Sequence, residues 1–434
     1  KVLRFRNHPC IALWCARNEG NPPPAIDKGI QTLVDDLDPG RLYQPSSTSG
    51  RGVISHGPYH WRTPREFYQF SHAFKTEIGS MSVPTLEAVH AMMPERDWNV
   101  INDDWAEHDF CKGAQQGNLY PGILSRRYGP VSSLADFVRK AQLANYEAFR
   151  AMYEGRFARL FHPVTGILTW MSNPAQPSFV WQLYSHDLEP NASLFAVHHA
   201  CEPVHIQMNQ DNWHVLIINN TPRPLAALTA KTTVFHLDGT SGQVQSATLN
   251  VAPSQVTDTG VVASPENQVR FVKLELRDAQ NRLVSDNFYW QAATNRPDDL
   301  QALNQLPLVT LNIHATRHDN HGVCRLDVSV DNPTESVALM AHLQLRREHA
   351  GRRVLPVYYS DNDFSLLPGE TRSLTIEAAD SDLDGEAPQL VVDGWNVTAK
   401  PVPAAGNSVA VGPNAGAQVI GKILPPLDLS RVEK

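Results

Sequence analysis

Hydrophobic positions follow two different patterns on either side of residue 203. Up to about residue 202, short apolar runs alternate with longer stretches in which apolar side chains recur every three or four residues. This is the pattern of buried strands followed by amphipathic helices. After residue 203, short segments of alternating apolar and polar residues are separated by turn-forming residues, which is typical of antiparallel sandwiches. The sequence therefore predicts an α/β region followed by an all-β region.

The α/β region contains recurring strand and helix signals. Strands are predicted at 11–17, around 41–44, near Glu77 and at 166–171, and helices near 25–37, at about 132–153 and at 190–200. The first helix has five apolar residues on one face: Ile26, Ile30, Leu33, Val34 and Leu37. The long helix is expected to bury Leu134, Phe137, Val138, Ala141, Ala148 and Met152.

The all-β region divides into two parts. A polar linker at about 294–306 separates one set of predicted strands from a second set. The expected domains are 1–202, 203–296 and 307–400, followed by an extended tail at 401–434 that is rich in Pro, Ala and Gly. With 434 residues, the chain is long enough for several domains.

Composition excludes several classes of function. The net charge of −8 comes without long charge runs, so nothing favours binding to nucleic acid or to an anionic membrane surface. No stretch approaches the ~18 apolar residues of a membrane span, and a soluble protein is expected. The five cysteines are odd in number and lack the spacing of metal ligands. Asp361-Asn362-Asp363 resembles part of a calcium loop but lacks its Gly and terminal Glu, and it is interpreted as a turn.

Two carboxylates are of interest because each one ends a predicted buried strand. The apolar run at 11–17 stops at Asn18-Glu19, and a second strand carries Glu77 just before Gly79. In a barrel of parallel strands, catalytic side chains lie at the carboxyl ends of the strands. A pair of carboxylates is also what hydrolysis of a glycosidic bond requires. The alternatives are ion pairs, with Glu77 bound to Lys75 or to an arginine.

Two rival carboxylates lie nearby in the sequence. Glu66 falls in a polar loop and Glu87 in a predicted helix. Neither of them ends an apolar strand, so the sequence favours Glu19 and Glu77.

Three blocks of sequence resemble glycoside hydrolase family 2. Residues 6–19 resemble the acid/base segment of that family, and residues 75–80 resemble its nucleophile segment. Residues 166–173 and 177–184 resemble the last barrel strand of the branch that contains β-mannosidases, endo-β-mannosidases and exo-β-glucosaminidases. The blocks keep the family's order along the chain.

The resemblance implies a fold and a mechanism. Residues 1–202 would be the C-terminal portion of a catalytic (β/α)8 TIM barrel, followed by two immunoglobulin-like β-sandwich domains. Glu19 would be the general acid/base and Glu77 the nucleophile of a double displacement that retains configuration. Asn18 would hydrogen-bond the hydroxyl on carbon 2 of the sugar. This mechanism needs no metal and no organic cofactor.

Aromatic side chains near these blocks are candidate sugar contacts, because an indole face suits the C–H side of a pyranose. Trp170 is expected to form the floor of the sugar site at the end of the last strand. The other candidates are Tyr59, Trp61 and Trp181, each of which could instead pack in a loop or the core.

The number of strands is too small for a closed barrel. Roughly five strand–helix units fit into the first 200 residues, whereas a closed barrel has eight. In the resembled family, the acid/base residue follows the fourth strand. We therefore expect that an N-terminal fragment of the same precursor completes the barrel.

The expected substrate is a β-mannoside or a glycan that contains Man-β-1,4-GlcNAc. In the resembled exo-β-glucosaminidases an aspartate occupies the position of Glu19, so the Asn18-Glu19 pair favours the mannosidase side. The alternatives are an exo-β-D-glucosaminidase or another β-glycosidase of the family. An alternative of another class is a non-catalytic carbohydrate-binding protein.

Overall fold

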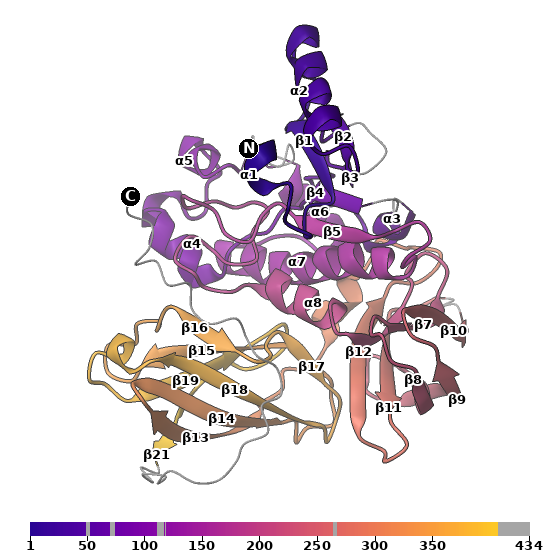
Figure 1. The fold of residues 1–434 in the computed structure, drawn as a ribbon. Coiled ribbons are helices and arrows are strands. Elements are labelled where there is room, and N and C mark those ends of the chain that lie inside the picture. Colours follow the sequence, from indigo (N-terminus) through magenta and orange to yellow (C-terminus); the bar gives the residue numbers. More distant parts are fainter. Residues whose placement is uncertain (49–52, 70–73, 111–116, 118, 264–266, 407–434) are drawn as a thin grey trace.

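The computed structural model describes residues 1–48, 53–69, 74–110, 117, 119–263 and 267–406. Helix α7 (Leu134–Phe157) runs across the middle of the molecule (Figure 1). The parallel strands lie on one side of this helix, and two β-sandwiches lie next to each other on the other side. The predicted change from α/β to all-β is confirmed.

Five parallel strands carry the candidate catalytic residues. Strands β1 (Leu13–Arg17) and β2 (Leu42–Ser46) form one parallel pair. Strands β3 (Val53–Ile54), β4 (Phe74–Ile78) and β5 (Gly166–Thr169) form a second parallel sheet in that order. The four strands predicted for this region are therefore present, and β3 is a further short strand that was not predicted.

Side chains and loops join the two parallel sheets where no strand ladder does. The Gln44 amide donates to the Val53 carbonyl at 2.8 Å and accepts from the Val53 N–H at 3.1 Å. Just beyond the strand ends, the Ser55 N–H donates to the Ser47 carbonyl at 2.7 Å. The carboxyl ends of β1 to β5 therefore follow one another along a single rim.

The helices of the α/β region begin and end where capping rules place them. They are α1 (Val2–Phe5), α2 (Pro24–Leu37), α3 (Pro64–Gln69), α4 (Leu86–Met92), α5 (Asp103–Glu107), α6 (Tyr120–Tyr128), α7 and α8 (Ala192–Ala200), with a 3₁₀ turn at Glu95–Asp97. Ser133 caps α7 by accepting from the Asp136 N–H at 3.2 Å. Every residue from 143 to 156 in α7 is buried, because the parallel sheet, α8 and the sandwiches surround the helix.

Helix α2 is present as predicted, but its apolar face is largely exposed. Only Val34 is buried, whereas Ile26 is 55% exposed and Leu33 is 54% exposed. Figure 1 shows α2 projecting from the body together with β1 and β2. Among the described residues, α1, β1 and β2 cover only part of this face.

Each all-β part is a pair of antiparallel sheets. The first part contains β6 (Val204–Met208), β7 (His214–Asn219), β8 (Leu225–Phe235), β9 (Ser241–Val251), β10 (Gln255–Val261), β11 (Arg270–Arg277) and β12 (Leu283–Gln291). Its sheet orders are β10-β7-β6 and β12-β11-β8-β9, and its interior is a separate hydrophobic core.

The second part shares the main hydrophobic core with the α/β region. Its strands are β13 (Asn312–Asn320), β14 (Val323–Asp331), β15 (Ala338–Arg347), β16 (Val357–Tyr359), β17 (Phe364–Leu366), β18 (Thr371–Ala379), β19 (Pro388–Asp393), β20 (Lys400–Pro403) and β21 (Ala405–Gly406). Strands β20 and β21 correct the expected start of the tail, because they pair with β19 and β13. The rest of the predicted tail, 407–434, lies outside the described residues. Two 3₁₀ turns, Gln301–Gln305 and Asp380–Leu383, complete the region.

Candidate active site

The rim of the parallel strands is held by a chain of polar contacts. The Ser47 hydroxyl donates to the side-chain Oδ1 atom of Asn18 at 3.1 Å and accepts from the backbone N–H of Glu19 at 3.0 Å. It also accepts from the Ser55 hydroxyl at 3.0 Å. Residues that follow β1, β2 and β3 are thus fixed to one another, and they place Glu19 in a left-handed backbone conformation (φ 42°).

Tyr59 brings the two candidate carboxylates together. Its hydroxyl donates to Oε1 of Glu77 at 2.5 Å, and the same hydroxyl lies 3.3 Å from Oε1 of Glu19. Burial, and then the hydrogen bond to Glu77, raises the pKa of the Tyr59 hydroxyl well above its usual value. Tyr59 is therefore a neutral donor between the carboxylates.

The shared contact limits the distance between the carboxylates. The two Oε1 atoms lie no further apart than the two contacts to the Tyr59 oxygen combined. That bound is shorter than the separation of about 6.5–9.5 Å typical of inverting glycosidases. The short bound suits a nucleophilic role for Glu77, because the carboxyl groups of retaining glycosidases are only about 5–5.5 Å apart.

The strand ends position Tyr59 from two sides. The Gly79 N–H donates to the Pro58 carbonyl at 2.9 Å, and the indole N–H of Trp181 donates to the Tyr59 carbonyl at 2.7 Å. A Cβ atom at Gly79 would lie 2.4 Å from the carbonyl oxygen of Trp170. Only glycine permits this close approach, which explains why a glycine follows the Glu77 strand.

A cavity of about 490 Å³ opens beside these residues. Its lining includes Glu19, Tyr59 and His56, whose Nδ1 atom is 3.7 Å from Glu19. Such a volume is within the range of small-molecule sites. A sugar ring that entered this cavity would meet the Glu19 side chain, which is 44% exposed.

The same cavity is lined by two cations that have no carboxylate within ion-pair distance among the described residues: Lys75 and Arg156. The Lys75 ammonium donates to the Ser55 carbonyl at 2.9 Å, and Arg156 donates to the Met152 carbonyl at 3.0 Å. Burial, and then the charge of Arg156, lowers the pKa of Lys75 to about 8. The sequence reasoning missed both residues as parts of a site. The position of Lys75, two residues before Glu77 in the strand, was the available signal.

The alternative ion-pair reading of Glu77 does not fit this geometry. Its described contact is with Tyr59 rather than with Lys75. The rival carboxylates are engaged elsewhere, because Glu66 accepts from Thr63 and Glu87 pairs with Arg346 at 2.6 Å.

The structure separates the predicted aromatic contacts into two groups. Trp170, at the end of β5, is 45% exposed, and Trp181 packs edge-on against Tyr59 with ring centroids 5.9 Å apart. Trp61 is only 6% exposed, and its indole N–H donates to the Ala144 carbonyl of α7. The prediction that Trp61 contacts sugar is therefore wrong, because its side chain is part of the core.

The described residues also bear on metal binding and membrane insertion. Among the described residues, no three His, Cys, Asp or Glu side chains are placed to hold a metal ion. Within the same part of the chain, no helix has the length and apolar character needed to span a membrane.

This chain is similar in sequence and in structure to several glycoside hydrolases. Residues 287–397 match the family model described as the exo-β-D-glucosaminidase Ig-fold domain. The exo-β-D-glucosaminidase of Streptomyces avermitilis is 32% identical over 93% of this chain and 49% of the relative. The mannosylglycoprotein endo-β-mannosidase of Lilium longiflorum is 26% identical over 91% of this chain and 53% of the relative. The chain thus spans about half the length of the curated relatives it matches.

A solved structure agrees with these relatives. The exo-chitosanase of Amycolatopsis orientalis superposes with a TM-score of 0.82 at 27% identity, over 92% of this chain and 52% of that one. Variants of that enzyme with an aspartate or a glutamate replaced by alanine are solved in complex with PNP-β-D-glucosamine.

Proposed function

The chain belongs to glycoside hydrolase family 2, in its exo-β-glucosaminidase and β-mannosidase branch, and from this premise we propose that it carries the catalytic pair of a retaining β-glycosidase. The observation that carries the proposal is the contact of Tyr59 with both Glu77 and Glu19. Glu77 attacks the anomeric carbon and forms a glycosyl-enzyme intermediate. Glu19 protonates the leaving oxygen and then deprotonates the incoming water.

Other residues of the rim have supporting roles in this proposal. Asn18, held by Ser47, faces the substrate beside Glu19 and bonds a ring hydroxyl. The exposed face of Trp170 supports the sugar ring, and Trp181 acts through Tyr59 rather than by direct contact.

The proposed fold of the α/β region is the C-terminal part of a (β/α)8 barrel. Of the described strands, β1 and β5 each have a neighbour on one side only. Leu42 of β2, Leu168 of β5 and Trp170 are exposed, although strands of parallel sheets are normally buried on both faces. A preceding segment of the same precursor would pair with these edges, cover the apolar face of α2 and bring carboxylates to Lys75 and Arg156.

The proposed substrate class is the β-D-glucosaminide. It is supported by the family model, by the Streptomyces relative and by the Amycolatopsis complexes with PNP-β-D-glucosamine. A β-mannosidase is the second candidate. Glu19 stands where an aspartate is expected in glucosaminidases, and the Lilium relative is an endo-β-mannosidase.

A substrate panel separates the two candidates. The full-length protein, with any segment that precedes this chain, would be assayed with p-nitrophenyl β-D-glucosaminide, p-nitrophenyl β-D-mannoside and a Man-β-1,4-GlcNAc oligosaccharide. We expect the glucosaminide to have the highest kcat/KM. A preference for the mannoside or for the oligosaccharide would reverse the order of the candidates. Absence of turnover together with retained sugar binding would support the non-catalytic alternative.

A further inference from the structure

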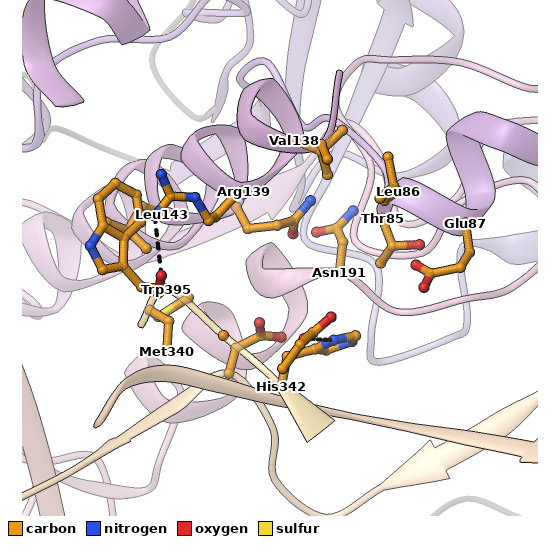
Figure 2. Close-up of a pocket in the computed structure, with 15 residues that line it drawn as sticks. Thr85, Leu86, Glu87, Val138, Arg139, Leu143, Asn191, Met340, His342 and Trp395 are labelled. Atoms are coloured by element: carbon orange, nitrogen blue, oxygen red, sulfur yellow. Dashed lines mark hydrogen bonds and ion pairs between the residues drawn. The ribbon is translucent and has the colours of Figure 1, made fainter. Parts of the chain in front are cut away.

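A second cavity lies far from the catalytic rim, between the α/β region and the second sandwich. Its volume is about 220 Å³. Helices α4, α7 and the start of α8 contribute one wall, and β15 and the end of β19 contribute the other (Figure 2). The cavity exists only because the two regions pack against each other.

Most charged groups of this cavity already have partners. His342 pairs with Asp393 at 2.9 Å, and Glu87 pairs with Arg346 at 2.6 Å. Arg139 stacks on the indole of Trp395 with its guanidinium 4.1 Å from the ring centre, and it donates to the Trp395 carbonyl at 3.1 Å. These groups need no ligand.

Asp363 is different. Its side chain lines the cavity, the residue is 4% exposed, and its Oδ2 atom is buried without a hydrogen-bond partner among the described residues. Burial raises the pKa of Asp363 to about 7, and the nearby carboxylates of Asp393, Asp361 and Glu189 act in the same direction against His342. A buried carboxylate without a donor is costly, so the Asp363 carboxylate is suited to receive one.

The rest of the lining defines what kind of donor fits. Apolar side chains form much of the wall: Leu86, Val138, Leu143 and Met340. Neutral polar groups at Thr85, Gln142 and Asn191 lie among them. A metal ion would need several oxygen ligands, and no group of three His, Cys, Asp or Glu is placed for one in the described chain. An organic cation satisfies both the carboxylate and the apolar wall.

We propose that this cavity binds a small primary ammonium compound, whose N–H groups donate to Asp363 and whose body contacts the apolar wall. The ligand would touch α7 and the second sandwich together. Because it binds only the packed arrangement, it would stabilise the contact between the two regions.

Isothermal titration calorimetry on the full chain tests the proposal, with cyclohexylammonium as the probe and cyclohexanol as its uncharged analogue. Measurements at about pH 8 keep Asp363 ionised. The variant is Asp363→Asn, which keeps the size of the side chain and tolerates its left-handed backbone (φ 52°). Asp331→Asn, in β14 of the same sandwich, is the matched control.

We expect cyclohexylammonium to bind the unmodified chain at least about tenfold more tightly than cyclohexanol, because a hydrogen bond between charged groups is strong. Asp363→Asn should remove that preference, and Asp331→Asn should preserve it. Equal affinity for the two probes in the unmodified chain, or an unchanged preference in Asp363→Asn, would overturn the proposal. A parallel arm with D-glucosamine and D-glucose shows whether the ammonium can belong to an amino sugar or only to an alkylamine.

Discussion

The parallel strands and the two sandwiches differ in how completely their apolar surfaces are covered. Strand β14 of the second sandwich alternates buried and exposed residues along its length, as expected for a sheet with one core face. Strand β1 has no buried residue, and helix α2 buries only Val34, although both contain large apolar side chains. The catalytic candidates therefore lie in the part that leaves more apolar surface exposed, while the first sandwich has a core of its own and the second shares the main core with the rest of the α/β region.

The largest expected effect concerns the rim of the parallel strands. Glu77→Gln should lower kcat of the full-length protein by at least about 10³-fold, because the nucleophile is lost. The midpoint of denaturant unfolding should stay unchanged, since Glu77 has no described ion pair. Glu66→Gln is the control and should retain activity. A Glu77→Gln enzyme with normal turnover would remove Glu77 from the mechanism.

The second effect concerns the buried contacts between α7 and the first sandwich. Glu154 of α7 is fully buried and is bound by Tyr68, His205, Asn287 and Tyr289. Glu154→Gln should lower the free energy of unfolding by about 3 kcal/mol, because it leaves buried partners without a charge to bind. Chemical denaturation measures the loss.

Glu275→Gln is the matched control for Glu154→Gln. Glu275 pairs at 2.6 Å with Arg277, the last residue of β11, and is partly exposed. Its loss should therefore lower the free energy of unfolding by less than about 1 kcal/mol. Equal losses of unfolding free energy in Glu154→Gln and Glu275→Gln would contradict a larger contribution from the buried contacts of Glu154.

The third effect is a pH dependence of the unfolding free energy that arises from Asp361 in the second sandwich. Asp361 is buried, and the pairs with His199 and Arg372 lower its pKa from 3.8 to about 2. A depressed carboxyl pKa gives stability that is present above the unfolded value and is lost as the pH falls through the folded value. The difference in unfolding free energy between the unmodified chain and Asp361→Asn should therefore shrink by about 2 kcal/mol from about pH 6 to pH 2. A constant difference across this range would argue against the pairs.

The fourth effect returns to the rim. Tyr59→Phe should lower kcat about tenfold, because the hydroxyl that bonds both carboxylates is lost while the ring that packs on Trp181 stays. Steady-state kinetics of the full-length protein measures the change, with KM expected to move little. An unchanged kcat would show that Glu19 and Glu77 need no bridge.

The smallest effect contrasts an exposed and a buried position within α2. Leu33→Gln in α2 should change the stability of this chain by less than about 0.5 kcal/mol, whereas Val34→Ala, one residue further, should cost about 1–3 kcal/mol because Val34 is buried. In the full-length protein, Leu33→Gln should become destabilising if the preceding segment covers α2.

The sequence was informative wherever local pattern and local chemistry coincide. Glu19 and Glu77 could be proposed because each lies at the end of an apolar run, and α7 could be placed because Ser133 and the recurring apolar residues mark it. The second sandwich could be placed from alternation and turns. These features are all written within short windows of the chain.

Features that depend on contacts between distant residues were not predictable. Trp61 has the composition of a sugar contact, and only its bond to Ala144, 83 positions away, shows that it is core. Arg156 enters the cavity from the end of a long helix, with no local signal. The exposure of the α2 face was not predictable either, because periodicity indicates which side is apolar and cannot show whether a partner exists.

Helix α7 imposes a limit on how the chain can change in length. Its residues 143 to 156 are all buried, so no turn within this stretch faces solvent. One inserted residue would rotate everything beyond it by about 100° and would move Glu154 and Arg156 away from their partners together. Insertions and deletions among natural variants should therefore be found in the loops before and after α7, and the spacing between Glu147 and Arg156 should be constant.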